Sequence, residues 1–149
     1  MSQDKTDEQR THIVDDEHFK RGMDLLTEMG REKTMQDHKH LSEDLYRYSV
    51  GFLFGEIWQR PHLSLRDRQI ITLAANIAMS RPTGSHSHFR SAKKIGLTHE
   101  EIMEIIIHVG MYCGWPVMSH SVKQYIEVLE GEKRADPWAP PAGEDKAKP

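Results

Sequence analysis

The chain has 149 residues, which is the usual length of one domain and too short for two ordinary domains. Its 20 lysine and arginine residues and 23 aspartate and glutamate residues give a formal net charge of -3. There is therefore no whole-chain positive field to gather nucleic acid or anionic lipid, and neither is an expected partner.

The single cysteine, Cys113, cannot form an intramolecular disulfide bond. The sequence shows no secretory leader and no apolar run long enough to cross a membrane. These features predict a protein of a reducing, cytoplasmic compartment.

The first part of the chain predicts a polar arm followed by two helices. Residues 1–14 lack a sustained period, so we expect them to be flexible. Asp15 or Asp16 caps a helix that ends at Gly30, and Ser42 begins a second pattern that runs into the turn-rich residues 54–61. The apolar faces consist of Phe19, Met23, Leu26 and Met29 in the first helix, and Leu45, Tyr48 and Phe52 in the second.

The clearest core element follows capping-box spacing between Ser64 and Asp67. Apolar residues from Ile70 to Ala78 predict a largely buried helix, whose alanines favour close approach of other helices or of a second subunit. Residues 81–84 interrupt it.

The second half predicts three more helices. One runs from about Ser85 to Ile95 and ends at Gly96, and the next begins at a full capping box formed by Thr98 and Glu101. Residues 114–116 then interrupt the chain before a last helix that we expect to end at Gly131.

From Glu132 the composition changes to charge, alanine and proline, which predicts an extended or disordered tail at 132–149. Trp138 in this tail is either exposed or docked on a neighbouring subunit. The sequence thus predicts an all-α fold, with one bundle of six to seven helices over residues 15–131.

Histidine pairs raise the question of a metal site. His86 and His88 lie two residues apart, so on a helix they point roughly 200° away from each other and cannot chelate one ion. His38 and His40 meet the same objection. Neither His-x-x-x-His nor Cys-x-x-Cys occurs in the predicted helices, so we expect no metal site.

Several motifs occur together in a characteristic order. They are Phe54-Gly55-Glu56-Ile57-Trp58-x-Arg60-Pro61, Leu65-Arg66-x-Arg68, Arg81-Pro82, His88-x-Arg90, Gly96-Leu97-Thr98-x-Glu100-Glu101-Ile102 and Glu104-x-x-x-His108-x-x-x-Tyr112-x-Gly114-x-Pro116. In order and spacing this series resembles the carboxymuconolactone decarboxylase family from about residue 42 to residue 130. The resemblance implies an alkylhydroperoxidase D-like helical fold and a homo-oligomer, either a trimer or a hexamer.

The wider superfamily includes thiol-dependent peroxide-defence proteins with Cys-x-x-Cys followed four residues later by histidine. If that histidine is aligned with His88, Arg81 and Gly84 stand at the cysteine positions, and Gln69 stands where those proteins have a glutamate. Because both sulfurs are absent, dithiol redox chemistry has no reactive group here.

The resemblance implies decarboxylation of 4-carboxymuconolactone or a related conjugated acid, in the catabolism of aromatic compounds. In such a substrate the carboxylate leaves a carbon conjugated to the lactone carbonyl, so the substrate is its own electron sink. We therefore expect neither a metal nor an organic cofactor. The protein must hold the anionic groups, stabilise the dienolate oxygen and return a proton to carbon.

Histidine and arginine suit these tasks. We predict His88 as the general acid or oxyanion donor, and Arg90 or Arg81 as the group that holds a substrate carboxylate. Arg90 faces away from His88 on a regular helix, so a structural ion pair is its alternative role. Glu56 either orients a histidine or arginine or caps the next segment. His120 is a further catalytic candidate.

Five more residues are predicted to bind substrate: His86, Trp58, Tyr112, Cys113 and Trp115. For Cys113 and Trp115 a buried thiol and a packing indole are the commoner roles. His108 is expected to be a hydrogen-bonded core histidine.

The sequence thus predicts a cofactor-independent decarboxylase that forms an enol-lactone and CO₂. The alternative is a non-catalytic oligomeric protein of the same fold that binds a small acid or serves as a scaffold.

Overall fold

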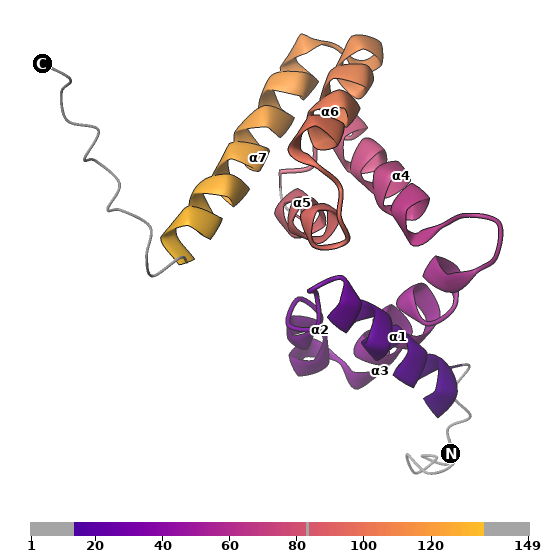
Figure 1. Ribbon diagram of the computed structural model, residues 1–149. Coiled ribbons are helices and arrows are strands. Elements are labelled where there is room, and N and C mark those ends of the chain that lie inside the picture. The colour runs from indigo at the N-terminus through magenta and orange to yellow at the C-terminus, as the bar shows by residue number, and fades with distance from the viewer. Residues whose placement is uncertain (1–13, 83, 136–149) are drawn as a thin grey trace, which may run out of the picture. The chain divides into compact units, whose positions relative to one another are not determined.

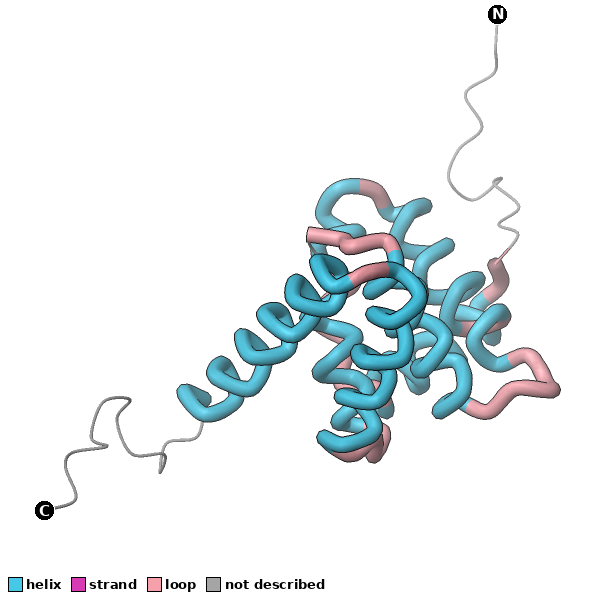
Figure 2. The backbone as a smooth tube through the Cα atoms, turned by 90° about the horizontal axis from the view of Figure 1, so that it is seen from above, coloured by secondary structure: helices cyan, strands magenta, loops and turns pink. Residues whose placement is uncertain are grey.

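The computed structural model describes residues 14–82 and 84–135, and every regular element in these ranges is a helix (Figures 1 and 2). The all-α prediction is therefore confirmed. The predicted arm at residues 1–13 and the tail from residue 136, with Trp138, lie outside the described residues. The elements are α1 (Asp16–Glu28), α2 (Gln36–Leu41), α3 (Glu43–Arg47), the π-helix η2 (Tyr48–Phe54), the 3-10 helix η3 (Ile57–Gln59), α4 (Leu65–Ala78), α5 (Ser85–Lys94), α6 (His99–Cys113) and α7 (Trp115–Ala135).

The described residues form two compact units. The first contains residues 14–69 and 94–96, and the second contains residues 70–82, 84–93 and 97–135. The single domain expected over 15–131 stays a prediction. Within the described ranges, no helix has the length and apolar character needed to cross a membrane.

In the first unit, α1 packs closely against η2. Asp15 caps α1 by accepting a hydrogen bond of 2.9 Å from the backbone N–H of His18, and Gly30 follows the helix with a φ of +67°. A Cβ atom at Gly22 would lie 1.9 Å from the carbonyl oxygen of Val50, so only glycine permits this approach. The shared core consists of Leu25, Leu26, Met29, Met35, Tyr46, Val50, Phe54 and Trp58.

The predicted apolar face of the second helical pattern is exposed in the single chain. Leu45, Tyr48 and Phe52 are 39%, 46% and 49% exposed. The buried side chains come from the opposite face, with Tyr46 and Val50, because α1 covers that side. Periodicity therefore indicated the face of Leu45, Tyr48 and Phe52 and missed the one that the single chain buries.

Both predicted capping boxes are confirmed. The backbone N–H of Ser64 donates to Oδ2 of Asp67 at 3.2 Å, and the N–H of Asp67 donates to Oγ of Ser64 at 3.0 Å. Thr98 and Glu101 make the same reciprocal pair at the start of α6. These bonds satisfy backbone donors that a helix start leaves without intrahelical partners.

In the second unit, α6 and α7 lie side by side and antiparallel, joined at Gly114 (Figures 1 and 2). The ring of Phe89 on α5 stacks on Tyr125 of α7, with ring centroids 5.2 Å apart. The buried hydrophobic side chains of this unit are Leu73, Ile77, Phe89, Ala92, Leu97, Ile102, Ile106, Tyr125 and Val128.

Two details of the predicted helices were wrong. The helix from Ile70 to Ala78 is not largely buried in the single chain, since Ile71 is 53% exposed and Ala78 is also exposed. Gly131 does not end the last helix, because α7 continues to Ala135. A glycine within an exposed helix costs too little to stop it when the neighbouring turns continue.

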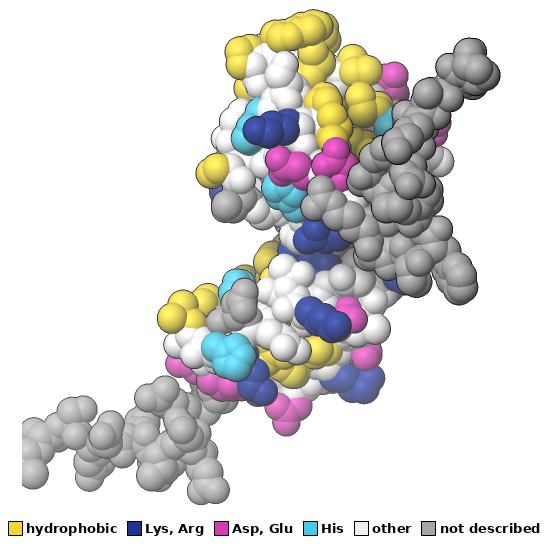
Figure 3. Space-filling model, turned by 90° about the vertical axis from the view of Figure 1, so that its left-hand side faces the viewer, with side chains coloured by type: hydrophobic (Ala, Val, Ile, Leu, Met, Phe, Trp, Pro, Cys, Tyr) yellow, Lys and Arg dark blue, Asp and Glu magenta, His cyan; other side chains and the backbone are white. Residues whose placement is uncertain are grey.

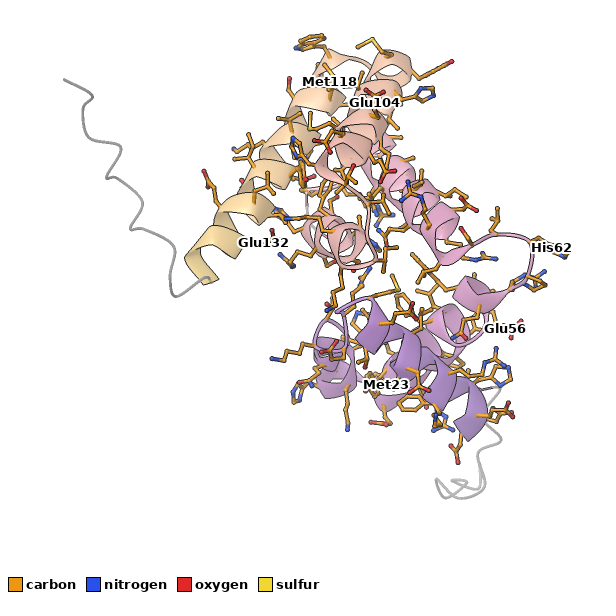
Figure 4. All side chains as sticks on the ribbon, viewed as in Figure 1. Met23, Glu56, His62, Glu104, Met118 and Glu132 are labelled. Carbon is orange, nitrogen blue, oxygen red and sulfur yellow. The ribbon has the colours of Figure 1, made fainter. Side chains whose placement is uncertain are left out.

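We predict opposite effects for alanine at two glycines of the α6–α7 pair. A Cβ at Gly110 would lie 2.7 Å from Cβ of Met118, whose place on α7 is labelled in Figure 4, so Gly110→Ala should lower the free energy of unfolding by roughly 1–3 kcal/mol. Gly131 has open space around its Cβ position, so Gly131→Ala should raise it by about 0.5–1 kcal/mol. Urea unfolding monitored by circular dichroism measures both. A stabilising Gly110→Ala would contradict the close approach of α6 and α7.

Candidate active site

The polar residues around the start of α5 belong to the second unit. The break between α4 and α5 contains Ser80 with a φ of +47° and Gly84 with a φ of +89°, and α5 begins directly after it. The buried residues of α5 are Ser85, Phe89, Ser91 and Ala92. His86 and His88 leave the helix on opposite flanks of the buried stripe of Ser85, Phe89 and Ala92, as their spacing requires.

His86 connects α5 to α7. Its Nε2 lies 2.7 Å from Oε2 of Glu127, and this hydrogen bond holds the pKa of Glu127 below its usual range. An ionised carboxylate only accepts hydrogen bonds, so Nε2 of His86 carries the proton in this pair. The opposite nitrogen, Nδ1, then accepts a hydrogen bond or, in the imidazolium form, donates one.

Two side chains of α7 are hydrogen-bonded to the same backbone carbonyl group in the α4–α5 break. The carbonyl oxygen of Arg81 accepts hydrogen bonds from Nε2 of Gln124 at 2.9 Å and from Nε2 of His120 at 3.3 Å. His120, Gln124 and Glu127 share one face of α7 because they lie four and three residues apart. The guanidinium of Arg81 is exposed, and its Nη2 lies 3.9 Å from the sulfur of Met79.

His88, the leading catalytic candidate, is half-buried on α5, and Arg90 is exposed. On a regular helix these two side chains point apart. The contacts of His86 and Phe89 with α7 therefore fix the helix that carries His88, while His88 itself lies on the other flank of the buried stripe.

Glu56 and Trp58 lie in the first unit. Oε2 of Glu56 is 3.5 Å from Nε2 of His18 and 3.7 Å from Nη2 of Arg21. A hydrogen bond to Asp15 and, more weakly, the charge of Glu56 raise the pKa of His18. Trp58 is 9% exposed and packs on Phe54.

The remaining candidates lie at the turn between α6 and α7. Tyr112 and Trp115 are 83% and 69% exposed, and Cys113 is also exposed. Expecting a buried thiol and a packed indole was therefore wrong for the single chain. His108 is also exposed, its ring lying 5.2 Å from that of Tyr112, so it is not the core histidine expected.

These exposed residues belong to an apolar patch that we call the α6–α7 patch, made of Ile107, Met111, Tyr112, Cys113 and Trp115. Figure 3 shows hydrophobic side chains gathered over this end of the second unit, at the top of the view. One sequence signal for an exposed position was the Gly114-Trp115-Pro116 break itself, since a sharp turn between helices lies at a surface.

Sequence reasoning missed Gln124 and Glu127. Both stand on a helix whose apolar stripe was easy to find, and they repeat at helical spacing with His120. That polar stripe was the available signal. Within the described ranges, no three His, Cys, Asp or Glu side chains gather in a group that could hold a metal ion.

Comparison with known proteins agrees with the helical fold and the motifs. Residues 43–126, more than half of the chain, match the model of the carboxymuconolactone decarboxylase family. The chain therefore belongs to this family.

Two characterised relatives are similar over most of the chain. A 4-carboxymuconolactone decarboxylase from Acinetobacter baylyi is 28% identical over 120 residues, covering 78% of this chain and 90% of that protein. A nitrosuccinic acid decarboxylase from Metarhizium robertsii is 28% identical over 116 residues, covering 78% of this chain and 81% of that protein. Both relatives are decarboxylases, and their substrates differ.

The pair formed by His86 and Glu127 predicts a pH-dependent contribution to stability. Because the folded-state pKa of Glu127 is lowered, its contribution is present above the unfolded-state pKa and is lost as the pH falls through the folded-state pKa. Glu127→Gln should therefore be less stable than the parent at pH 7, and the difference should shrink as the pH falls below about 4.

Urea unfolding of the two proteins at a series of pH values measures this difference. Glu104→Gln, which removes an exposed negative charge from α6, controls for the change in net charge (Figure 4). A destabilisation of the same size at pH 7 and pH 3 would show that the pair with His86 is not its source.

Proposed function

We propose that this protein is a cofactor-independent decarboxylase of a small acid, with 4-carboxymuconolactone as the leading substrate. The observation that carries the proposal is the half-buried His88 on a helix anchored to α7, in a chain of a decarboxylase family. The two named relatives support decarboxylation as the reaction, while the lactone and the pathway of aromatic catabolism are part of the proposal.

The two relatives' substrates share one chemical feature. In 4-carboxymuconolactone the departing carboxylate is on a carbon next to a C=C bond that is conjugated to the lactone carbonyl, and nitrosuccinic acid carries a nitro group beside a carboxylate. In both, an electron-withdrawing group within the substrate accepts the electron pair of the breaking C–C bond. The substrate class proposed for this protein is therefore an acid that supplies its own electron sink.

The proposed reaction has two steps. The bond between carbon and the carboxylate breaks, CO₂ leaves, and the electron pair moves onto the lactone carbonyl to form a dienolate. The imidazolium of His88 then gives its proton to carbon, which restores the carbonyl and leaves a neutral imidazole. Arg81 or Arg90 holds an anionic group of the substrate and keeps it in register with the histidine.

The residues that contact α7 serve this site by positioning. His86 and Glu127 fix the first turn of α5, and His120 and Gln124 fix the carbonyl group of Arg81. We assign His86 and His120 to this role because their hydrogen bonds join protein segments to one another. Proton transfer is assigned to His88, on the other flank of α5.

Replacement of His88 tests the mechanism. His88→Ala should lower kcat for 4-carboxymuconolactone by about 10²–10⁴, the usual contribution of a general acid. Glu127→Gln should lower kcat less, because this substitution loosens α5 but leaves the general acid His88 in place. His40→Ala, an exposed histidine on α2, is the matched control and should retain the parent rate.

CO₂ release is the readout, with 4-carboxymuconolactone and nitrosuccinate as alternative substrates. If His88→Ala folds and keeps the parent rate, the assignment of the acid is wrong although the protein is a decarboxylase. If neither substrate releases CO₂, the non-catalytic alternative replaces the enzyme.

We further propose that the protein acts as a homo-oligomer in the cytoplasm. The α6–α7 patch supports assembly, because contiguous exposed apolar surface of this kind commonly marks a protein interface. Trp115→Ser and Tyr112→Ser together should shift the protein to a smaller species in sedimentation velocity. An unchanged sedimentation coefficient, with the parent oligomeric, would show that this patch lies outside the interface.

A further inference from the structure

The first unit contains a pocket of about 410 Å³ between α1, η3 and the start of α4. This volume is in the range of small-molecule sites, which is roughly 300–1,000 Å³. Its apolar wall includes Leu25, Leu63 and Leu65, and its polar groups include Arg60 and Glu28. Trp58 also lines the pocket, although it is 9% exposed.

Trp58, which lines the pocket, carries one hydrogen-bond donor, its indole N–H. Its indole packs on the ring of Phe54, with centroids 5.6 Å apart, so its position is fixed by the core. The indole N–H donates to no side chain or carbonyl within residues 14–82 and 84–135. Because an indole N–H can only donate, a ligand placed against it must present an acceptor.

Arg60 supplies the positive charge. Its guanidinium is exposed and forms no ion pair with any residue of the described ranges. Its carbonyl oxygen accepts a hydrogen bond of 2.7 Å from Nη2 of Arg68, and its ψ of 145° is the extended conformation that the following Pro61 requires. The backbone that carries this charge is thus fixed without a ligand.

Gln59, the neighbour of Arg60 in the pocket lining, is hydrogen-bonded to α1 and to η2. Nε2 of Gln59 donates to the carbonyl oxygens of Arg21 and Phe54, at 3.0 and 2.8 Å. Beyond Pro61, His62 has a φ of +86°, a conformation that side chains other than glycine rarely adopt. Backbone conformations of this kind occur often at ligand sites.

The other charges of the pocket are largely engaged by neighbours. Arg21 lies 3.7 Å from Glu56 and donates to the carbonyl of Gly55, and Asp24 pairs with Lys20 at 2.9 Å. Glu28 on α1 disfavours a second carboxylate on the ligand. The pocket thus combines the guanidinium of Arg60, unpaired among the described residues, with the apolar side chains of Leu25, Leu63 and Leu65, beside the carboxylates of Asp24 and Glu28.

We propose that this pocket binds a small monocarboxylic acid with an apolar ring or chain. The carboxylate contacts Arg60 and the indole N–H of Trp58, and the apolar body lies against Leu25, Leu63 and Leu65. The proposed site does not use His88, and every residue that lines it belongs to the first unit.

The test uses the full chain labelled with ¹⁵N and follows the indole N–H signal of Trp58, assigned by its loss in Trp58→Phe. Benzoate is the probe, and benzamide is its uncharged counterpart of the same shape. The signal should move in a saturable manner with benzoate, and benzamide should bind at least tenfold more weakly. A signal that does not respond to benzoate, or that responds equally to both, overturns the proposal.

Substitutions test whether Arg60 provides the positive charge that binds the carboxylate of benzoate. Arg60→Gln should weaken benzoate binding at least tenfold, whereas Lys33→Gln, which removes an exposed positive charge outside the pocket, should leave it unchanged. Equal effects of the two substitutions contradict a specific role of Arg60. His88→Ala should bind benzoate like the parent, and loss of binding in that variant contradicts an independent site. Far-UV circular dichroism confirms that each variant is folded.

Discussion

The stacking of Phe89 on Tyr125 is the contact on which the candidate site depends. It fixes α5 against α7 through two buried rings with centroids 5.2 Å apart. The hydroxyl of Tyr125 is also within 3.2 Å of Nδ1 of His99, and burial raises the pKa of Tyr125. Once these rings are packed, the polar stripe of α7 faces the start of α5 and can hold it by hydrogen bonds.

Those hydrogen bonds explain why so many polar side chains lie at one helix junction. A break between helices leaves backbone carbonyl groups without helical partners, and here the carbonyl of Arg81 is served by Gln124 and His120. The bond between His86 and Glu127 adds a charged contact one turn further along α7. The junction is thereby held in one orientation, as the role proposed for His88 in the first turn of α5 requires.

Local features of the fold could be predicted from the sequence because their causes are local. The capping boxes at Ser64 and Thr98 and the end of α1 at Gly30 follow from hydrogen bonds or φ values within a few residues. Long-range features could not be predicted from the sequence. Whether α1 covers Tyr46 or Tyr48, and which residue of α7 meets His86, depends on packing between segments far apart in sequence. The family resemblance pointed to His88 as a catalytic candidate, which stays a prediction, and it gave no information about the contacts between α5 and α7.

Two residues of the α4–α5 break, Arg81 and Gly84, also bear on the kind of chemistry that this fold can perform. At the positions where thiol-dependent relatives of the superfamily carry cysteines, this chain has Arg81 and Gly84, and its single cysteine lies at the exposed α6–α7 turn. Arginine at the first position places a permanent positive charge beside the helix of His88, and glycine at the second permits the φ of +89° that begins α5. In the proposed reaction, Arg81 attracts an anionic group of the substrate and His88 presents an imidazole to it. In the proposed decarboxylation the substrate is its own electron sink, so these two groups would serve it without a thiol.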